Sequence, residues 1–319
     1  MTLTDISNKK VLILGASGQI GSSLLSQLLD SNNKISAVRK SDWRNIDNKE
    51  INYLSVDLDK LKSKELSNLV LENDYIFHLA GDIKVQCDLK EEKSYLESWL
   101  NPLQNILSSL VGTNKKFLFA SSCSQYGTEP KLPVNELSKE NPLTSYDLSK
   151  TFSDYLVHYY RTVYKVNCCS LRFSNIYGPA DINSKIDRKI INKILHIIHT
   201  TEEISIIEDG NFLRNYLHVF DAASMFLHVA NNIEKVPAIV IACSKENYLF
   251  KEVILKLVEI YQKKTNKNIV VNYGLKKKFI SDIRQFSSQP SSIFCKNFTF
   301  KYNLERGFED LVDKLIQDE

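Results

Sequence analysis

The sequence has little that would mark a secreted, metal-binding or membrane-spanning protein. Its six cysteines include no Cys-x-x-Cys pair and no spacing typical of zinc ligands, so we expect no metal site and a reducing cytoplasm. No apolar run reaches the length of about 18 residues that a membrane span needs, and the start of the chain lacks the pattern of a signal peptide. The net charge of +3 is small and the lysine clusters are short, which argues against a nucleic-acid surface. We expect a soluble globular protein with no nucleic-acid or membrane partner.

Glycine is also scarce, with 10 residues in 319, but three of the ten lie close together near the N-terminus. Residues 11–14 form a short apolar run that ends at Gly15, and Gly18 and Gly21 follow, with apolar residues at helical spacing beyond them. Strand, glycine turn and helix in this order are the context that a dinucleotide-binding loop requires. Gly15 permits the turn, Gly18 admits a pyrophosphate at the helix N-terminus, and Gly21 lets the helix pack closely on the strand.

The end of the second predicted strand, residues 34–38, indicates which cofactor the loop would hold. An acidic residue at this place selects NAD, whereas a basic residue accommodates the 2′-phosphate of NADP. The sequence has Arg39 and Lys40 here, and a guanidinium group suits a phosphate. We therefore expect NADP(H), with two alternatives: that the basic pair only faces solvent, and that Asp42 binds the ribose instead.

A second motif, Tyr146-Asp147-Leu148-Ser149-Lys150, indicates the chemistry. Positions four apart lie on one face of a helix, so the Tyr146 phenol and the Lys150 ammonium point into the same space. A cation close to a phenol favours the charged form of that phenol. A phenol in such a place can exchange a proton with a sugar hydroxyl or alkoxide. Taken alone, the same spacing also occurs by chance on solvent-facing helices.

Together, the loop Gly15-x-x-Gly18-x-x-Gly21 and the motif Tyr146-x-x-x-Lys150 resemble the extended short-chain dehydrogenase/reductase family, whose members act mostly on nucleotide sugars. The resemblance implies an α/β fold: a doubly wound, parallel Rossmann sheet plus a smaller mixed α/β domain for the substrate. It implies an NADP-binding domain at residues 1–175 plus about 222–245, and a nucleotide-sugar domain at 176–221 and 246–319. The cofactor-binding residues that it implies are Gly15, Ser17, Gly18, Gln19, Ile20, Gly21, Arg39, Lys40, Asp57, Leu58, Leu79, Ala80, Gly81, Tyr146, Lys150 and Ser174.

The resemblance assigns the reaction to four residues. Ser122 would orient the substrate oxygen, Tyr146 would transfer the proton, and Lys150 would tune Tyr146 and hold the ribose. Cys123 matches a catalytic cysteine of the family's 3,5-epimerase/4-reductases, although Lys189 stands in place of the histidine that acts with it. A cysteine is also common at this turn, so a packing role is the alternative. The substrate-binding residues implied by the resemblance are Ser122, Ser124, Asn175, Lys189 and Arg214.

The sequence departs from the family pattern at several places. Cys123 and Ser124 replace the Asp-Glu pair with which sugar-nucleotide 4,6-dehydratases remove water, so we do not expect dehydration. Trp99 stands where family members have an asparagine near the nicotinamide, which puts that contact in doubt. Pro102 replaces a glycine of the same motif and is expected to start a helix. Farther on, Asp221 is expected to cap the N-terminus of the next helix.

These observations lead to one main hypothesis and two rivals. The main hypothesis is a cytoplasmic NADPH-dependent reductase of a 4-keto (deoxy)hexose nucleotide sugar, serving surface-polysaccharide synthesis, with Tyr146 as the proton donor. The first rival is an NAD(P)-dependent epimerase of nucleotide sugars, either a 4-epimerase or a 3,5-epimerase/4-reductase. The second is a non-enzymatic NADP sensor on the same fold, which the presence of both Tyr146 and Lys150 disfavours. Because family members commonly dimerise through a four-helix bundle that includes the catalytic helix, we also expect a homodimer.

Overall fold

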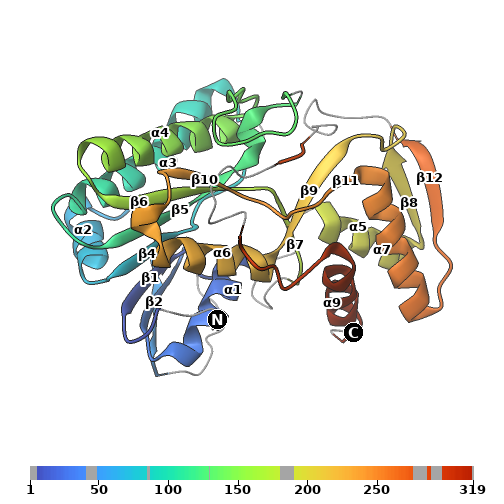
Figure 1. Cartoon of the computed structure of the whole chain (residues 1–319), viewed down its shortest axis with the longest axis horizontal. Coiled ribbons are helices and arrows are strands. Elements are labelled where there is room, and N and C mark those ends of the chain that lie inside the picture. Colours follow the sequence, from blue (N-terminus) through green and yellow to red (C-terminus); the bar gives the residue numbers. More distant parts are fainter. Residues whose placement is uncertain are drawn as a thin grey trace.

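A parallel seven-stranded sheet forms the larger part of the molecule (Figure 1). The computed structural model describes residues 6–40, 49–84, 87–128, 130–179, 190–275, 286–288 and 297–317. The strand order is β10-β6-β5-β4-β1-β2-β3, and every neighbouring pair is parallel. The strands are β1 (Lys10–Leu14), β2 (Lys34–Arg39), β3 (Ile51–Ser55), β4 (Tyr75–His78), β5 (Lys116–Ser122), β6 (Asn167–Phe173) and β10 (Ile239–Ala242). This topology confirms the predicted doubly wound parallel sheet.

Helices cover both faces of this sheet, as Figure 1 shows. On one face lie α1 (Gln19–Leu28) and α6 (Val219–Asn231). On the other face lie α2 (Ser63–Leu71), α3 (Leu89–Ser109) and α4 (Ser145–Val163). A strand that is covered on both faces is apolar along its whole length, which explains why residues 11–14 form an uninterrupted apolar run.

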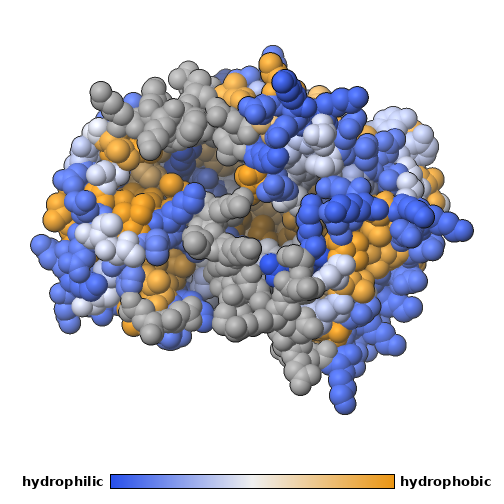
Figure 2. Space-filling view, turned by 180° about the vertical axis from the view of Figure 1, so that it is seen from behind, coloured by the Kyte–Doolittle hydropathy of each residue, from blue (hydrophilic) through white to orange (hydrophobic). Residues whose placement is uncertain are grey.

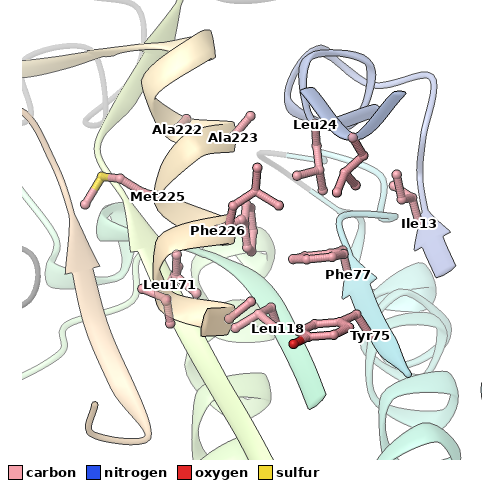
Figure 3. Close-up of a cluster of buried hydrophobic side chains, with 14 of the residues drawn as sticks. Ile13, Leu24, Tyr75, Phe77, Leu118, Leu171, Ala222, Ala223, Met225 and Phe226 are labelled. Carbon is pink, nitrogen blue, oxygen red and sulfur yellow. The ribbon is translucent and has the colours of Figure 1, made fainter. Parts of the chain in front are cut away.

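Alternate strand residues build the core on the side of α1 and α6. Ile13, Phe77, Leu118 and Leu171 belong to this cluster, and Phe226 of α6 packs edge-on against Phe77 with ring centres 6.0 Å apart (Figure 3). The residues between them along the strands belong to the opposite cluster, under α2, α3 and α4. Burial of each such side chain contributes roughly 1.5–3 kcal/mol, so the two cores hold the carboxyl edge of the sheet firmly in place.

A smaller α/β part follows, on the right of Figure 1. It contains a three-stranded sheet in the order β11-β9-β7 and a two-stranded sheet of β12 and β8. Its apolar cluster, which includes Tyr177, Leu257 and Phe308, is separate from the two clusters of the large sheet. Its strands are β7 (Asn175–Tyr177), β8 (Glu203–Ile207), β9 (Leu213–His218), β11 (Asn247–Leu249) and β12 (Val270–Leu275), and its helices are α5 (Ile190–Thr201), α7 (Phe250–Thr265) and α9 (Leu304–Gln317). Short 3-10 helices occur at Leu29–Ser31, Cys123–Tyr126 and Ile233–Lys235.

Two local expectations were wrong. Pro102 does not start a helix but lies inside α3, which begins thirteen residues earlier at Leu89; the apolar side chains of α3 pack on the sheet and outweigh the helical hydrogen bond that a proline cannot donate. Asp221 does not cap α6, because the helix begins at Val219. Its carboxylate instead accepts hydrogen bonds from the backbone N–H groups of Lys301 and Tyr302, at 2.9 and 3.0 Å. Asp221 therefore anchors the C-terminal segment to α6.

On the face shown in Figure 2, hydrophilic residues cover much of the surface, and apolar residues are exposed in separate groups between them. Within the ranges that the structure describes, no helix combines the length and the apolar character needed to cross a membrane.

Candidate functional site

A cavity of about 510 Å³ runs along the carboxyl ends of β3, β2, β1 and β4. The chain passes from β1 through β2 to β3 and then crosses back to β4 on the other side of β1, so the strand order reverses between β1 and β4. Open α/β sheets bind ligands at such a reversal. The cavity is lined by Gly15, Ser17, Gly18, Val38, Arg39, Lys40, Val56, Asp57, Leu58, Asp59, His78, Leu79, Ala80, Gly81, Asp82, Ser98, Trp99 and Pro102. Among the described residues, no group of His, Cys, Asp and Glu side chains could hold a metal ion.

The glycine loop packs so closely that side chains at two of its glycine positions would collide with neighbouring backbone. Gly15 has a φ of +88°, and a Cβ at this position would lie 2.7 Å from the backbone nitrogen of Ala80. A Cβ on Gly21 would overlap the carbonyl oxygen of Gly15. Gly18 is the N-cap of α1 and lines the cavity, so the helix begins at the cavity wall. A helix N-terminus offers unpaired N–H donors and a favourable dipole to a phosphate, and the loop therefore fits the pyrophosphate of a dinucleotide.

The end of the cavity at β2 and β3 combines charges of both signs. Lys40 Nζ lies 3.3 Å from Asp57 Oδ2 and 3.8 Å from Asp59 Oδ2. Arg39 lines the same cavity and forms no ion pair with a carboxylate in the described part of the chain. Of the two basic residues, Lys40 is therefore paired with carboxylates of the protein, whereas Arg39 has no such partner among the residues that the structure describes.

Tyr146 and Lys150 lie one turn apart on α4, as their spacing predicts. Thr144 caps this helix, and its Oγ1 accepts a hydrogen bond from the Asp147 N–H at 3.1 Å. The Lys150 ammonium lies 5.5 Å from the centre of the Tyr146 ring, and it donates a 2.6 Å hydrogen bond to the carbonyl oxygen of Ala120 on β5. The cation is thus held beside the phenol by the neighbouring strand.

Ser122 ends the same strand, two residues beyond the carbonyl that holds Lys150. Its Oγ donates a 2.9 Å hydrogen bond to Ser124 Oγ and accepts one from the Ser124 N–H at 3.1 Å. The end of β5 and the first turns of α4 therefore bring together the serine, tyrosine and lysine that the sequence singled out.

His78 lies at the bottom of the cavity, near this group. Its ring packs edge-on against Phe117 and Phe119, with ring centres 6.2 and 5.5 Å apart, and its Nδ1 has no hydrogen-bond partner among the described residues. Burial, and after it the positive charge of Lys150, lowers the pKa of His78 to about 3. The imidazole is therefore neutral at physiological pH and serves as a packed residue of the strand.

Cys123 is turned away from the cavity. Its thiol is buried and donates a hydrogen bond to the carbonyl oxygen of Arg172, with the sulfur 3.1 Å from that oxygen. Burial, and next the nearby Cys243, raises the pKa of the Cys123 thiol well above its usual value. A thiol that is buried, protonated and hydrogen-bonded to the backbone suits packing better than acid–base catalysis.

A buried ion-pair network connects α4 to β6. The Arg172 guanidinium has no exposed surface; its Nε lies 2.7 Å from Asp154 Oδ2 on α4, and its Nη2 lies 2.6 Å from Glu140 Oε1. Asp154 also accepts hydrogen bonds from Ser170 on β6 and from Gln125. Removal of one partner from a buried pair of this kind costs about 3–5 kcal/mol. The network therefore fixes the helix of Tyr146 and Lys150 against β6.

Two of the residues expected to bind substrate, Asn175 and Arg214, lie in the smaller part, on β7 and β9. Gln19 Nε2 donates to the carbonyl oxygen of Gly178 at 2.9 Å, so this side chain bridges the two parts. Asn175 Nδ2 donates to the carbonyl oxygen of Asn215 at 2.9 Å, and the Arg214 guanidinium lies 5.0 Å from the centre of the Phe212 ring. Ser174, which the resemblance assigns to the cofactor, is buried, and its Oγ has no hydrogen-bond partner in the described ranges. Asp42 and Lys189 lie outside the described residues.

Sequence reasoning noticed Trp99 only as a departure from the family pattern. In the structure its indole lines the cavity from α3 and lies against the Lys150 ammonium, with the nitrogen 4.0 Å from the ring centre. The only indication in the sequence was an aromatic residue where a small polar one was expected. The contact with Lys150 could not be inferred from it, because that contact depends on α3 placing Trp99 between the cavity and α4.

The fold and the site together define a Rossmann protein of the extended short-chain dehydrogenase/reductase type. The profile of the NAD dependent epimerase/dehydratase family matches residues 11–242, which is well over half of the chain, and the chain therefore belongs to this family. Membership confirms the predicted enzyme class and supports a nicotinamide dinucleotide as the cofactor.

The chain is similar to several characterised proteins. It is 30% identical over 244 residues to the dTDP-D-glucose 4,6-dehydratase of Dictyostelium discoideum; the match covers 70% of this chain and 55% of that protein, so the chain spans about half the length of this relative. The UDP-N-acetylglucosamine 4-epimerase of Methanobrevibacter ruminantium M1, solved with UDP-N-acetylmuramic acid, has a similar structure, with a TM-score of 0.85, 20% identity, and coverage of 98% of this chain and 100% of that one. The UDP-glucuronic acid 4-epimerase of Bacillus cereus, solved with UDP-glucuronic acid and NAD, gives a TM-score of 0.80, 20% identity, and coverage of 97% and 100%. At these identities the two structures show the fold alone.

Proposed function

We propose that the protein is an NADPH-dependent reductase of a 4-keto nucleotide sugar, with Tyr146 as the proton donor. The observation that carries the cofactor half of this proposal is the difference between Arg39 and Lys40. Both basic residues line the cavity, but of the two only Arg39 has no carboxylate partner among the described residues. A guanidinium is well suited to the 2′-phosphate of NADP. The observation that supports reduction over dehydration is that Cys123 and Ser124 offer no carboxylate at the end of β5.

Each residue of the site would have a defined task. The reduced nicotinamide supplies the hydride. Ser122 would donate a hydrogen bond to the substrate carbonyl oxygen, and Tyr146 would give that oxygen its proton as negative charge develops there. Lys150 is held near Tyr146 by the Ala120 carbonyl and would stabilise the phenolate that remains. None of these steps requires a second acid or base, and the buried thiol of Cys123 is therefore assigned to packing.

We propose that the substrate binds between the two parts of the chain. Relatives and structural neighbours carry names of enzymes that act on nucleotide sugars, and one neighbour was solved with UDP-glucuronic acid. Arg214 suits the diphosphate of such a substrate because a guanidinium can bind two oxygens at once. The division of the chain follows from this proposal: residues 1–175 and about 222–245 would bind the cofactor, and 176–221 and 246–319 would bind the nucleotide sugar.

The cofactor assignment is tested by two single substitutions at neighbouring positions. Arg39→Ala should weaken NADPH binding by roughly 10- to 100-fold and leave NADH binding nearly unchanged, because it removes a charge-assisted hydrogen bond to the extra phosphate. Lys40→Ala is the matched control and should change the NADPH to NADH ratio little, since Lys40 is already paired with Asp57. Calorimetric titration measures both affinities. Equal binding of NADH and NADPH by the unmodified protein would reject the NADPH assignment.

The reaction is tested by mixing the purified protein with NADPH and a panel of 4-keto nucleotide sugars. Absorbance of the reduced cofactor should fall with at least one member of the panel. If no member is reduced, and nucleotide sugars instead change configuration without net consumption of cofactor, the second candidate function replaces the first.

That second candidate is a nucleotide-sugar 4-epimerase. It is favoured by the names of several structural neighbours and by the NAD with which some of them were solved. An epimerase takes a hydride from the sugar and returns it, so it keeps its cofactor through many turnovers. Denaturation of the purified protein and identification of any released dinucleotide separates the two functions: NAD in equal amount to protein would favour the epimerase.

We also propose that the chain forms a homodimer through α4. Phe152, Tyr155, Tyr159 and Val163 follow one another at helical spacing on α4 and are 40–52% exposed. An exposed apolar stripe of this kind is typical of an interaction surface, and a second copy of the same stripe would cover it. Sedimentation velocity on the purified chain gives the oligomeric state directly.

A further inference from the structure

Trp99 connects the cofactor cavity to the lysine of the catalytic pair. The indole lines the cavity from α3 and is only 5% exposed. Its six-membered ring lies directly against the backbone of Gly81, in the loop that follows β4, where a Cβ would overlap the ring. The close approach requires a glycine at position 81, which has a φ of +156°. The indole is therefore wedged into one place and is not a loosely packed surface residue.

The Lys150 ammonium lies over the indole. Its nitrogen is 4.0 Å from the centre of the Trp99 ring, 4.6 Å from that of Phe119 and 5.5 Å from that of Tyr146. The Trp99 and Tyr146 rings meet edge-on, with centres 6.1 Å apart. An ammonium close to an aromatic face is attracted by the ring, and tryptophan attracts it most strongly. Trp99 thus contributes to holding Lys150 where it faces Tyr146.

The same indole stands where the cavity ends. The cavity follows the carboxyl ends of β3, β2, β1 and β4, and its lining at the β4 end includes Trp99. Ser122, Tyr146 and Lys150, at β5 and α4, are not among the lining residues. Since β5 is the next strand along the sheet, a dinucleotide that fills the cavity and reaches Tyr146 has to pass along the indole.

We propose that Trp99 is a positioning residue for Lys150 and, at the same time, the wall against which the nicotinamide-riboside half of the cofactor binds. The proposal rests on the proposed binding of a nicotinamide dinucleotide. It assigns to one aromatic side chain two tasks, a contact with the cofactor and the support of the lysine.

The contact is tested by the fluorescence of Trp99 itself. The sequence contains two tryptophans, Trp43 and Trp99, so Trp43→Phe leaves Trp99 as the single source of tryptophan emission. This variant is titrated with NADP⁺ and, separately, with 2′-phospho-ADP-ribose, which has the same adenosine half, pyrophosphate and second ribose but no nicotinamide ring. We expect NADP⁺ to quench the emission strongly, because the pyridinium ring would lie against the indole. The analogue should quench it much less.

Calorimetry on the same samples measures binding itself, and it therefore separates the role of Trp99 from the proposed binding of a dinucleotide. If both compounds bind and quench equally, or bind without quenching, the nicotinamide does not contact Trp99 and the present proposal is wrong while dinucleotide binding stands. If neither compound binds, and NAD⁺ does not bind either, the proposed cofactor site itself is rejected, and the role of Trp99 with it.

The support of Lys150 is tested with Trp99→Phe and Trp99→Leu. Phenylalanine keeps an aromatic face under the ammonium, whereas leucine keeps only apolar volume. Loss of the cation–π contact should lower kcat of the leucine variant roughly tenfold. The phenylalanine variant should keep a kcat close to that of the unmodified protein. Equal kcat values for the two variants, at unchanged thermal stability, would reject the positioning role, because a residue that only packs does not distinguish the two substitutions in this way.

Discussion

The two ends of the cofactor cavity are built by different means. At the end formed by β1, β2 and β3, the site is built mainly from backbone, namely a glycine turn and the N-terminus of α1, and the end of β2 adds the Arg39 side chain. At the other end, the cavity stops at Trp99 beside β4, and the adjoining group at β5 and α4 consists of packed side chains, where Trp99, Phe119 and Tyr146 surround the Lys150 ammonium. The first end resembles the general dinucleotide site, whereas the second depends on contacts between side chains of β4, β5, α3 and α4.

The difference shows where variation can enter such a site. A pyrophosphate is recognised by N–H groups that every residue possesses, so its cradle depends on backbone shape and tolerates little change. The reactive end depends on how side chains hold one another, and here the indole of Trp99 packs against Gly81 and the Lys150 ammonium. We therefore expect substitutions at the β4–β5 end to change the rate and substitutions at the β1 end to change binding.

Tyr146→Phe should give the largest effect, and it tests the reactive end. Removal of the phenolic hydroxyl takes away the proposed proton donor, so kcat should fall by roughly 10²- to 10⁴-fold. The NADPH affinity should change little, because the cavity lining does not include Tyr146. Stopped-flow measurement of cofactor oxidation gives the rate, and calorimetry gives the affinity.

The control for this substitution is Tyr155→Phe. Tyr155 also lies on α4, but it is 51% exposed and its hydroxyl contacts Glu140 at 3.3 Å. This variant should retain the original rate. If Tyr146→Phe itself keeps most of the activity, another group donates the proton. The proposal that substitutions at the reactive end change the rate would then be wrong for Tyr146.

Gly21→Val tests the opposite end and should have an intermediate effect. Any side chain at this position meets the Gly15 carbonyl oxygen and the Ala16 backbone, neither of which can move aside without distorting the loop. Overpacking of this kind costs roughly 1–3 kcal/mol of stability, and the distorted cradle should lose affinity for the pyrophosphate. Thermal unfolding with and without NADPH measures both: the increase in Tm on adding cofactor should disappear.

Ser26→Ala serves as the control on the same helix. Ser26 is exposed and its hydroxyl contacts only the Ser23 carbonyl oxygen at 2.8 Å among the bonds observed. Stability and the cofactor-induced increase in Tm should both be preserved. An unchanged increase in Tm in Gly21→Val would mean that the cofactor does not depend on the shape of this loop.

The backbone-built end is also the end that could be predicted from the sequence. The spacing of Gly15, Gly18 and Gly21 after an apolar strand specifies a turn and a helix start whatever the rest of the chain does. The pairing of Tyr146 with Lys150 was predictable for the same reason, since it depends only on the geometry of one helix. Such local patterns predict structure because the contacts that they require lie within one turn or one helix.

What could not be predicted depends on contacts between distant segments. The burial of Cys123 follows from the position of the Arg172 carbonyl on β6, 49 positions further along the chain. Asp221 looked like a helix cap, but its carboxylate is used by the backbone of Lys301 and Tyr302. Trp99 belongs to the same class, because its role is set by Gly81 and Lys150. In each case the residue type was visible in the sequence and the partner was not.

The smallest expected effect is a change in the pH dependence of stability, and it concerns His78 at the reactive end. The folded protein holds this imidazole neutral with a pKa of about 3, whereas an unfolded histidine titrates near its ordinary value of about 6.5. Unfolding therefore takes up a proton below pH 6.5, and the stability contributed by the neutral form is complete above that pH and declines as the pH falls towards 3. The slope is about 1.4 kcal/mol per pH unit for one such group.

His78→Leu removes the titrating group and should make the decline shallower by that amount. Urea unfolding at pH 7, 6 and 5 measures the free energy of unfolding for both proteins; His218, whose pKa burial also lowers to about 3, contributes equally to each. His196→Gln, at an exposed position on α5, is the control and should keep the original slope. Parallel curves for His78→Leu and the unmodified protein would mean that His78 is solvated or charged in the folded state. Such a result would contradict the packed, water-poor character that distinguishes the β4–β5 end of the cavity from the other end.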